Sequence, residues 1–565
     1  MTTIQPRNIP SRAVSALAAA GISPLLARLF AARGVHSPSE LDLSFKALLP
    51  PELLTGAREA AELLADAIEA GARMVIVADY DCDGATACAV GVRALRSFGA
   101  DVHYLVPDRM TLGYGLTPPM VDIAAKFDPE VLITVDNGIA SIEGIAQARA
   151  HGMSTVITDH HLPGEILPEA DVIVNPNQPG CGFPGKSLAG VGVMFYVMLA
   201  LRAELRERGA LESGREPNLA SLLDLVALGT VADVVKLDHN NRILVSQGLQ
   251  RIRAGSMQPG IRALFAVSGR DAARATAFDL GFMLGPRLNA AGRIADMSLG
   301  IECLLADDPV QALQLARELD RLNHARREIE LEMQEDARQI LETFDAADDR
   351  CAGLTLFEPD WHPGVVGLVA GRIREKLHRP TIAFARGQNG ELKGSGRSIP
   401  GLHLRDALEL VARQNPGLVL RFGGHAMAAG LAIHEEKLPE FRAAFEEVAA
   451  SLLDPADLLH SIDTDGPLQA VDISLETARL LDREVWGQGF PPPVFDNVFH
   501  VERQRILKDR HLKLELSLDG TRFEALRFNC TERVPDIIHA AYRLNINEYK
   551  GLSSVQLMLE YFGAV

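Results

Sequence analysis

Apolar runs that stop at acidic residues divide the first half of the chain. The runs 74–78, 131–135 and 155–158 are short and mostly β-branched, and a further apolar run covers 222–231. The segments 85–98 and 142–151 between these runs predict helices. Strands that alternate with helices indicate an α/β fold with a doubly wound parallel sheet. We expect all four runs to be strands that end at the same edge of this sheet.

Carboxylates follow every one of these runs. Asp79, Asp81 and Asp83 follow the first run, and the later runs end at Asp136, at Asp159-His160-His161 and at Asp233. Ligands of such sheets bind outside the carboxyl ends of the strands, so we expect these side chains to gather at one edge. Anions that share a face repel one another unless a cation sits between them. The alternative for the first acidic stretch is a solvated turn that caps the next helix.

A gathered set of carboxylates and imidazoles has a defined chemistry. Carboxylate clusters are ligands for hard divalent ions such as Mg²⁺ or Mn²⁺. Two such ions lower the pKa of a bound water and clamp a phosphodiester for in-line attack. The residues alone therefore predict metal-dependent hydrolysis of a phosphoester, and they leave its substrate open.

The chain is too long for a single core, and its patterning predicts five regions. It has 565 residues, and Asp308-Pro309 followed by a charged stretch without Pro or Gly predicts the start of a long helix. Within the N-terminal region, 13–32 predicts two short helices. The expected regions are a helical segment at 1–50, a metal-site domain at 51–306, a connecting helix at 307–346, a second, smaller α/β domain at 347–458 and a C-terminal domain at 459–565.

The C-terminal region changes to a β pattern. Leucines alternate with polar residues along 511–518, Asp519-Gly520 marks a hairpin, and 521–528 and 555–561 predict further strands. A small β-barrel fits this pattern, and either nucleic-acid binding or a purely structural role is open to it. Phe523, Phe528 and Tyr549 are candidates for stacking on bases, with core packing as the alternative for each.

Two glycine-rich stretches of the second α/β domain predict anion contacts. Residues 393–398 place small residues around Ser395 and the forked guanidinium of Arg397. Residues 422–426 place His425 after two glycines. The alternative for the first stretch is a hairpin turn with surface charges, and for the second a plain turn.

Charge and cysteine content limit the functions that fit. The formal net charge is −18, which argues against a protein that coats DNA with a basic surface. A strand threaded through a local basic channel stays compatible with that charge. Six scattered cysteines, none in a Cys-x-x-Cys pair, favour a reducing cytoplasm and no zinc site. No apolar run approaches the ~20 residues of a membrane helix, so we expect no membrane partner.

The ordered motifs resemble a known family. Asp159-His160-His161 together with the Asp-x-Asp-x-Asp-Gly turn at 79–84 resembles the DHH phosphoesterase superfamily. Some members of that superfamily carry a histidine at the position of Val77, and Asp79 could supply the missing ligand here. Nearly the whole chain is similar to the RecJ family of single-stranded-DNA exonucleases, through the stretches 113–116, 188–192, 229–234, 285–293, 394–398, 422–425 and 486–491.

The resemblance implies a fold and an activity. It implies a DHH domain, a DHHA1-like substrate-binding domain at 347–458 and an OB-like barrel that binds single strands at 459–565. The implied activity is 5′-to-3′ degradation of single-stranded DNA to mononucleotides during repair and recombination. Alternatives are a DHH phosphodiesterase for small nucleotides, such as a cyclic dinucleotide or nanoRNA, and a non-catalytic replication scaffold. Single-strand-binding protein and a RecQ-type helicase are the implied partners, and the layout suggests a monomer.

The resemblance also assigns roles to individual residues. Two Mn²⁺ or Mg²⁺ ions are expected on Asp79, Asp81, Asp83, Asp136, His160 and Asp233, with Asp136 as the bridging ligand. His161 would contact the scissile phosphate, and Asp159 would orient a histidine. His160 and Asp136 complete the catalytic set. The candidates for holding substrate are Arg109, Arg287, Asn289, Arg293, Arg372, Ser395, Arg397 and His425.

Overall fold

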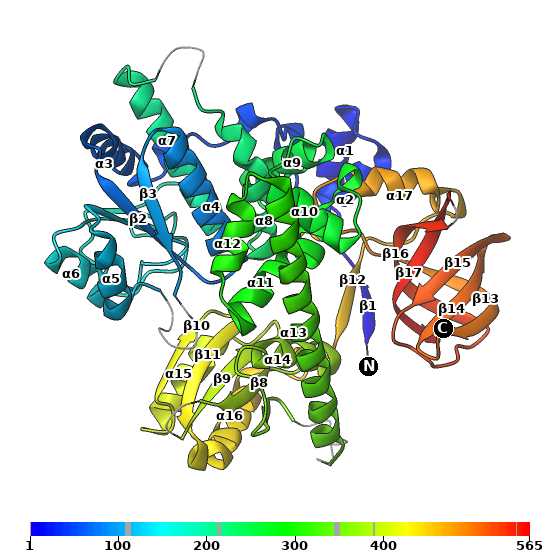
Figure 1. Ribbon diagram of the computed structural model, residues 1–565. Coiled ribbons are helices and arrows are strands. Elements are labelled where there is room, and N and C mark those ends of the chain that lie inside the picture. Colours follow the sequence, from blue (N-terminus) through cyan, green and yellow to red (C-terminus); the bar gives the residue numbers. More distant parts are fainter. Residues whose placement is uncertain are drawn as a thin grey trace. The chain divides into compact units, whose positions relative to one another are not determined.

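The chain forms two compact units in the computed structural model (Figure 1). The structure describes residues 2–107, 115–211, 216–343, 351–387, 390–549 and 551–564. One unit comprises Met1–Gln5 with Asn323–Asp463, and the other comprises Pro6–Leu322 with Thr464–Val565. The boundary at residue 322 falls inside the long helix α13, Pro309–Thr343.

A five-stranded parallel sheet with the order β3-β2-β4-β5-β6 forms the centre of the larger unit. The side chains of β2 alternate between two cores, with Met74 and Ile76 on one face and Val75 and Val77 on the other. Helices therefore cover both faces, as a doubly wound sheet requires. The strands are β2 (Arg73–Ala78), β3 (Asp101–Leu105), β4 (Val131–Val135), β5 (Ser154–Thr158) and β6 (Val172–Val174). The predicted fold class is confirmed.

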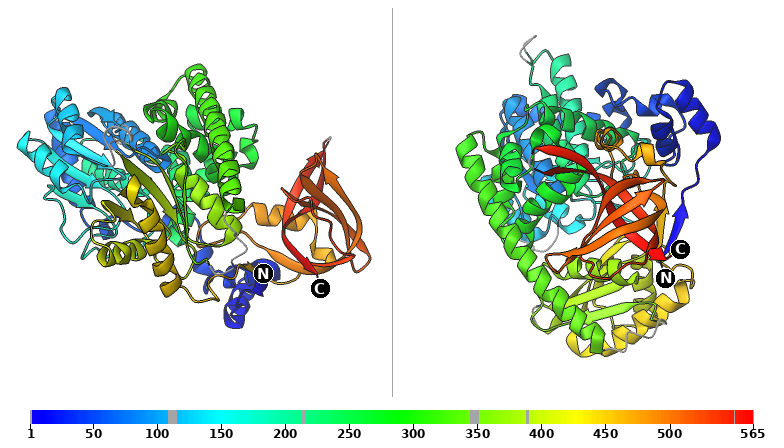
Figure 2. Two further views of the ribbon diagram at one scale, coloured as in Figure 1. Left: turned by 90° about the horizontal axis from the view of Figure 1, so that it is seen from below. Right: turned by 90° about the vertical axis from the view of Figure 1, so that its right-hand side faces the viewer.

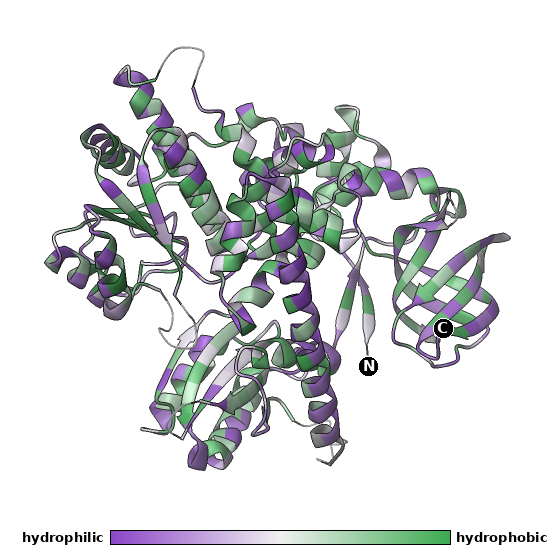
Figure 3. Cartoon of the chain, in the orientation of Figure 1, coloured by the Kyte–Doolittle hydropathy of each residue, from purple (hydrophilic) through white to green (hydrophobic). Residues whose placement is uncertain are grey.

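Helices of the larger unit cover the sheet or pack on the helices that cover it. Figure 3 shows apolar residues along α4, α7 and α8 (Leu223–Ala232), whereas α13 is mostly hydrophilic. The helices are α3 (Ala57–Ala70), α4 (Cys82–Ser97), α5 (Pro118–Ala124), α6 (Ile142–Ala150), α7 (Gly190–Glu207), α9 (His239–Arg253), α10 (Pro259–Ser268) and α12 (Ser298–Leu305).

The run 222–231 is a helix, so its prediction as a strand is wrong. It forms α8, Leu223–Ala232, which packs against α4, α7 and α9. Nearly every residue of α8 is buried, so the run is apolar all round and shows no helical period. A ten-residue apolar run of this kind fits a buried strand and a buried helix equally well. After a π-helical turn at Asp279–Leu284, α11 (Gly285–Ile294) also packs on α8.

The N-terminal region combines the two expected short helices with a strand that the sequence analysis missed. The helices are α1 (Ser11–Ala19) and α2 (Pro24–Ala31). The strand β1 (Thr3–Pro6) pairs with β12 (Ser461–Thr464). A strand of four residues without alternation gives no signal in the sequence. Its pairing partner lies more than 450 residues away in the chain, so no local pattern indicates the pairing.

The long helix begins where the sequence predicts. The Asp308 carboxylate accepts hydrogen bonds from the amides of Val310 (3.1 Å) and Gln311 (3.3 Å), which caps the first turn of α13. Among the described residues, no helix is long and apolar enough to cross a membrane.

The smaller unit contains a second α/β fold, as expected. Its sheet has the order β10-β11-β9-β8-β7, parallel between β7 and β8 and antiparallel elsewhere. Helices α14 (Val366–Leu377), α15 (Leu404–Gln414) and α16 (Leu438–Leu452) accompany it. The strands are β7 (Leu354–Phe357), β8 (Thr381–Arg386), β9 (Glu391–Arg397), β10 (Arg421–Gly424) and β11 (Ala428–His434).

The C-terminal region is a closed five-stranded barrel, which confirms the prediction (Figure 2). Leu512, Leu514 and Leu516 point into its core, and Asp519 (φ 48°) and Gly520 (φ 79°) form the expected tight hairpin. Helix α17 (Leu475–Asp482) precedes it. The strands are β13 (Phe495–Leu507), β14 (His511–Leu518), β15 (Thr521–Arg527), β16 (Ile537–Tyr549) and β17 (Leu552–Ala564).

Candidate metal centre

Three strand ends and two helix ends bring the predicted ligands together. Asp79 follows β2, Asp136 follows β4 and the Asp159-His160-His161 segment follows β5. Asp81 caps the N-terminus of α4, where its carboxylate accepts hydrogen bonds from the amides of Asp83 (2.9 Å) and Gly84 (3.0 Å). Asp233 reaches the same place from the C-terminal end of α8. The expected convergence therefore holds, although Asp233 does not come from a strand.

His160 lies at the centre of this group. Its Nε2 is 3.1 Å from Asp136 Oδ1, 3.5 Å from Asp233 Oδ2 and 3.9 Å from Asp83 Oδ2. Three overlapping sets of side chains offer ligand atoms within 4.8 Å of one another, namely Asp136-His160-His161, Asp83-His160-Asp233 and Asp79-Asp81-Asp136. Asp136 and His160 each belong to two of these sets.

Asp79 occupies the place that the sequence analysis gave it. Val77 is fully buried in the hydrophobic core beneath the sheet, so it has no access to the centre. Two residues later, Asp79 is buried at the end of β2 and contributes an oxygen to one of the three sets.

Glycines create the space that the carboxylates occupy. A Cβ at Gly190 would lie 2.5 Å from Asp136 Oδ1, and a Cβ at Gly229 would lie 3.0 Å from Asp83 Oδ1. Asp136 itself has a left-handed backbone (φ 62°), which is uncommon for a residue with a side chain. Strain and close approach at this point indicate that the position of the Asp136 carboxylate matters for function.

The N-terminus of α7 fixes the Asp83 carboxylate. Oδ2 accepts a hydrogen bond from the Gly190 amide (2.7 Å) and Oδ1 accepts one from the Val191 amide (2.8 Å). These are amides of the first helical turn, which lack partners inside the helix and attract negative charge. The sequence analysis missed this contact, because backbone amides leave no mark in the sequence.

Asp159 organises the two histidines. Its Oδ1 accepts hydrogen bonds from the amides of His160 (2.7 Å) and His161 (3.1 Å) and lies 2.8 Å from His161 Nδ1. On the other side, Asn177 donates to the His160 carbonyl (2.6 Å) and Asn175 donates to the His161 carbonyl (2.9 Å). The two asparagines were also missed, because single polar residues after a short strand carry no distinctive spacing.

Burial and mutual repulsion perturb the acids strongly. Burial raises the pKa of Asp83 to about 7, and the nearby charge of Asp233 adds to the effect. Burial likewise raises the pKa of Asp233 to about 7, with Asp81 adding to it. For Asp79 and Asp136, burial and neighbouring carboxylates raise the pKa well above its usual range. A cluster with such pKa shifts binds a cation favourably, because the cation stabilises the ionised form of every member.

The two histidines shift in opposite directions. Burial lowers the pKa of His160, so its imidazole is neutral and has a lone pair for a ligand. Burial also opposes protonation of His161, but the hydrogen bond and the charge of Asp159 outweigh it and raise the pKa of His161 to about 9. His161 is therefore cationic at neutral pH, which suits contact with an anion.

Two buried atoms test whether this donor set fits a metal ion. In the described part of the chain, neither Asp136 Oδ1 nor His160 Nε2 has a hydrogen-bond partner, although they are only 3.1 Å apart. An unsatisfied buried acceptor is costly, and such pairs are rare without a ligand. Carboxylate oxygens with one or two imidazoles suit Mn²⁺ and Mg²⁺. The residues fit the predicted ions.

Two of the predicted substrate residues of the larger unit make contacts inside the protein. Arg287 is buried and pairs with Asp320 (2.8 Å), which favours a structural role over contact with a phosphate. Asn289 accepts a hydrogen bond from the Cys82 amide (2.8 Å), so it supports the start of α4. Arg293 is half-buried near the end of α11. Arg109 lies outside the described residues.

The predicted substrate residues of the smaller unit lie on its sheet and on α14. Arg397 donates to Ser395 Oγ (3.2 Å) and to the Gly396 carbonyl (2.8 Å), and His425 is exposed in the turn after β10. Arg372 on α14 pairs with Glu330 (3.2 Å) and Glu375 (3.3 Å). The alternative of a hairpin turn at 393–398 is wrong, because residues 393–397 lie inside strand β9.

The glycines of β9 have a packing role. A Cβ at Gly394 would lie 2.5 Å from the Phe384 ring, and a Cβ at Gly396 would lie 2.7 Å from the Leu404 side chain. These glycines therefore let the backbone of β9 pack closely against the core of the smaller unit. The sequence analysis had expected them to bring the backbone close to an anion.

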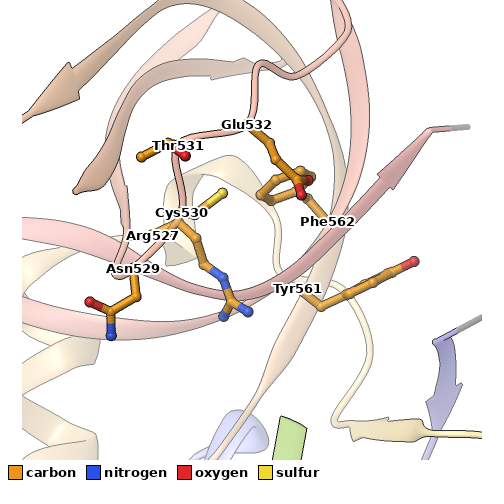
Figure 4. A pocket seen from close by; sticks show the side chains of 7 residues that line it. All are labelled: Arg527, Asn529, Cys530, Thr531, Glu532, Tyr561 and Phe562. Carbon is orange, nitrogen blue, oxygen red and sulfur yellow. The ribbon is translucent and has the colours of Figure 1, made fainter. Parts of the chain in front are cut away.

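A pocket of about 330 Å³ opens on the barrel, where β15 and β17 separate (Figure 4). Arg527, Tyr561 and Phe562 contribute to its lining, and Arg527 donates to the Leu559 carbonyl (2.9 Å). Phe528 is exposed beside it and meets His511 edge to face. Phe523 is buried, so its candidate role in base stacking is wrong and the packing alternative holds. The Tyr549 side chain lies outside the described residues.

The sheet, its buried carboxylates and the Asp-His-His segment define a DHH-type domain. Family models agree: the DHH family N-terminal domain matches 73–230, the DHHA1 domain matches 349–451 and the RecJ OB domain matches 464–561. Proteins named single-stranded-DNA-specific exonuclease RecJ are 52% identical in Dickeya dadantii, over 95% of both chains, and 50% identical in Escherichia coli, over 96% of both. The chain belongs to the RecJ family.

A solved structure gives the same result. RecJ from Thermus thermophilus in complex with Mn²⁺ matches with a TM-score of 0.84 and 31% identity, over 100% of this chain and 80% of that chain. A second structure of that protein, in complex with Mg²⁺, matches with a TM-score of 0.78.

Proposed function

We propose that the chain is a metal-dependent exonuclease that degrades single-stranded DNA from its 5′ end to mononucleotides. The observation that carries the proposal is the buried pair of Asp136 Oδ1 and His160 Nε2, 3.1 Å apart and without a hydrogen-bond partner among the described residues. In a member of the RecJ family, this pair has the donor chemistry for the ions that the relatives' structures contain.

Six residues would hold two Mn²⁺ or Mg²⁺ ions. The sharing of Asp136 between two of the three ligand sets supports its role as the bridge. The other proposed ligands are Asp79, Asp81, Asp83, His160 and Asp233. When bound, the ions supply an activated water and neutralise charge on the phosphate.

The remaining residues of the centre act on the phosphate and on each other. His161, held by Asp159 and protonated at neutral pH, donates a hydrogen bond to a non-bridging oxygen of the scissile phosphate. The Asp159 carboxylate keeps that imidazole oriented, and the α7 amides hold the Asp83 carboxylate in place.

The 5′ end would be held by cationic and small polar side chains. We assign this role to Ser395, Arg397 and His425, which gather on and beside one sheet, and to Arg109. Arg293 and Arg372 are further candidates for phosphate contact. For Arg287 and Asn289, the contacts with Asp320 and Cys82 favour support of the centre instead.

The cellular setting follows from the same proposal. All six cysteines are free, which suits a reducing cytoplasm. We propose a monomer that works in repair and recombination with single-strand-binding protein and a RecQ-type helicase.

The experiment uses two labels on one substrate. A single-stranded 30-mer labelled at the 5′ end and an identical one labelled at the 3′ end are digested with Mn²⁺. We expect the 5′ label to appear at once as a mononucleotide, while the 3′ label stays in shortening strands. Equal attack from both ends, or faster digestion of a duplex, contradicts the proposal. Faster turnover of dinucleotides than of the 30-mer would instead favour a small-nucleotide phosphodiesterase.

A further inference from the structure

Two exposed phenylalanines stack on each other in the larger unit. Phe278 and Phe282 are 50% and 64% exposed, and their rings are 4.8 Å apart between centroids with an interplanar angle of 20°. Phe278 directly precedes the π-helical turn Asp279–Leu284, and Phe282 lies inside it. Scattered exposed apolar residues are ordinary, but two stacked rings in water form an aromatic surface, and π-helical turns occur frequently at functional sites.

The pair stands on an anchored base. Asp279, which follows Phe278 in the chain, is buried, and its carboxylate accepts hydrogen bonds from the amide (2.9 Å) and the hydroxyl (2.8 Å) of Thr276. The same carboxylate pairs with Arg270 (3.2 Å), whose guanidinium carbon lies 6.0 Å from the centre of the Phe278 ring. The surface therefore combines two stacked rings on an anchored turn with an arginine at its side whose charge is partly offset by Asp279.

The turn packs directly on the helix end that carries a proposed metal ligand. A Cβ at Gly281 would lie 3.1 Å from Val231 Cγ1, and a Cβ at Gly285 would lie 3.1 Å from Ala232 Cβ. Both neighbours immediately precede Asp233. Phe282 therefore follows directly, in the chain, a residue that packs on α8 close to Asp233.

The same segment touches the barrel at its other end. Arg274, four residues before Phe278, forms an ion pair with Glu548 of β16. Glu548 also accepts a hydrogen bond from Ser553 of β17, so this contact lies at the β16–β17 hairpin. Along 274–285, the aromatic pair thus lies between the barrel contact and the metal centre.

We propose that Phe278 and Phe282 are a stacking platform for nucleobases of a single strand that runs between the barrel and the metal centre, with Arg270 facing its phosphates. The inference rests on the proposed function and adds a binding site to it. Aromatic faces hold single strands without sequence preference, because every base offers a π-face. An apolar protein partner is the other possible occupant of such a surface, and it is an outcome of the test below.

The test removes bases one at a time. The full chain is titrated by fluorescence anisotropy with a 5′-phosphorylated 20-mer, made resistant to cleavage by phosphorothioate linkages, in which a single abasic site is moved along the strand. With the wild-type chain, we expect one or two positions where the missing base weakens binding. The double variant Phe278→Ala/Phe282→Ala should bind the intact strand roughly tenfold more weakly. It should also lose the sensitivity at those positions.

Controls keep the outcomes distinct. Val310→Ala, which shortens another exposed apolar side chain, should bind the strand as the wild type does. Phe278→Trp/Phe282→Trp should retain the abasic profile, and the thermal midpoint of the alanine variant should match that of the wild type. Unchanged affinity or an unchanged abasic profile in the alanine variant overturns the platform. The platform is also overturned if the alanine variant binds the strand as the wild type does and loses only the binding of a protein partner. If the wild-type chain does not degrade single strands at all, the proposed function fails instead.

Discussion

Two buried charged clusters of the larger unit have opposite organisation. At the metal centre, four carboxylates have a raised pKa and three of them lie within 4 Å of His160 Nε2. Two facing atoms there, Asp136 Oδ1 and His160 Nε2, lack a hydrogen-bond partner among the described residues. At the junction between α2 and the barrel, Arg33 and Asp465 are 1% exposed and form two hydrogen bonds of 2.8 and 2.9 Å. One cluster is complete within the protein, and the other is complete only with cations.

The paired cluster shows what a structural solution to buried charge requires. Arg33 also donates to the carbonyls of Leu29 (2.8 Å) and Pro491 (2.6 Å), and its guanidinium lies 5.0 Å from the centre of the Trp486 ring. Asp465 accepts a further hydrogen bond from the Val494 amide (3.1 Å). A buried ion pair persists when its remaining donors and acceptors are satisfied in this way. The metal centre departs from that rule, which is the physical mark of a functional site.

Removing the shared ligand should have the largest effect on activity. Asp136→Ala takes away the carboxylate that belongs to two ligand sets, so we expect cleavage of single-stranded DNA to fall by roughly three orders of magnitude or more. The buried repulsion also disappears, so the thermal midpoint should stay or rise. Initial rates with Mn²⁺ and a thermal melt without metal measure the two effects. A variant that unfolds, or one that keeps a tenth of the activity, would contradict this view of the cluster.

Breaking the Arg33–Asp465 pair should have the opposite effect, a loss of stability. Asp465→Ala leaves the Arg33 guanidinium buried without its anion, and we expect a loss of about 3–5 kcal/mol in the free energy of unfolding. Urea denaturation measures it. The matched control is Asp101→Ala, which breaks the exposed pair with Arg73 (3.3 Å) and should leave the midpoint nearly unchanged. Equal effects of the two substitutions would show that the Arg33–Asp465 pair does not stabilise the unit.

A methyl group at Gly190 tests how closely the Asp136 carboxylate must pack against the start of α7. Gly190→Ala places a Cβ 2.5 Å from Asp136 Oδ1, so the carboxylate must move. We expect Mn²⁺ affinity and cleavage to drop about 10- to 100-fold, the range for disturbed support of a metal ligand. Calorimetric titration with Mn²⁺ gives the affinity. Gly182→Ala, at a glycine with open space around it, should change neither quantity.

The smallest effect concerns support of the centre. Asn289→Ala removes the acceptor for the Cys82 amide, which should cost about 1 kcal/mol in the free energy of unfolding. If Asn289 supports α4 and does not touch DNA, KM for single strands should stay within about twofold while kcat falls. A large rise in KM at unchanged kcat would return Asn289 to the substrate-binding residues.

The sequence predicted the sheet and the site well where the signal was local. β4 occupies the predicted residues 131–135, and the ends of β2, β4 and β5 carry Asp79, Asp136 and Asp159 as expected, because short β-branched runs between helices have one common solution. The exception is α8, whose uniformly apolar run hides its period, yet Asp233 still arrives at the centre.

Contacts between distant segments were beyond the sequence analysis. The pairing of β1 with β12, the α7 amides that hold Asp83 and the asparagines behind His160 and His161 depend on which segments meet in space. The glycines of β9 show the same limit, since their pattern suggested an anion site, whereas Phe384 and Leu404 explain them.

The most direct test of the central claim is anomalous diffraction from crystals of the full chain soaked with Mn²⁺. The account predicts two manganese peaks within the cluster, with Asp136 in contact with both and His160 in contact with at least one. Density that shows no manganese at Asp136 and His160, or a single ion bound elsewhere in the chain, would contradict it.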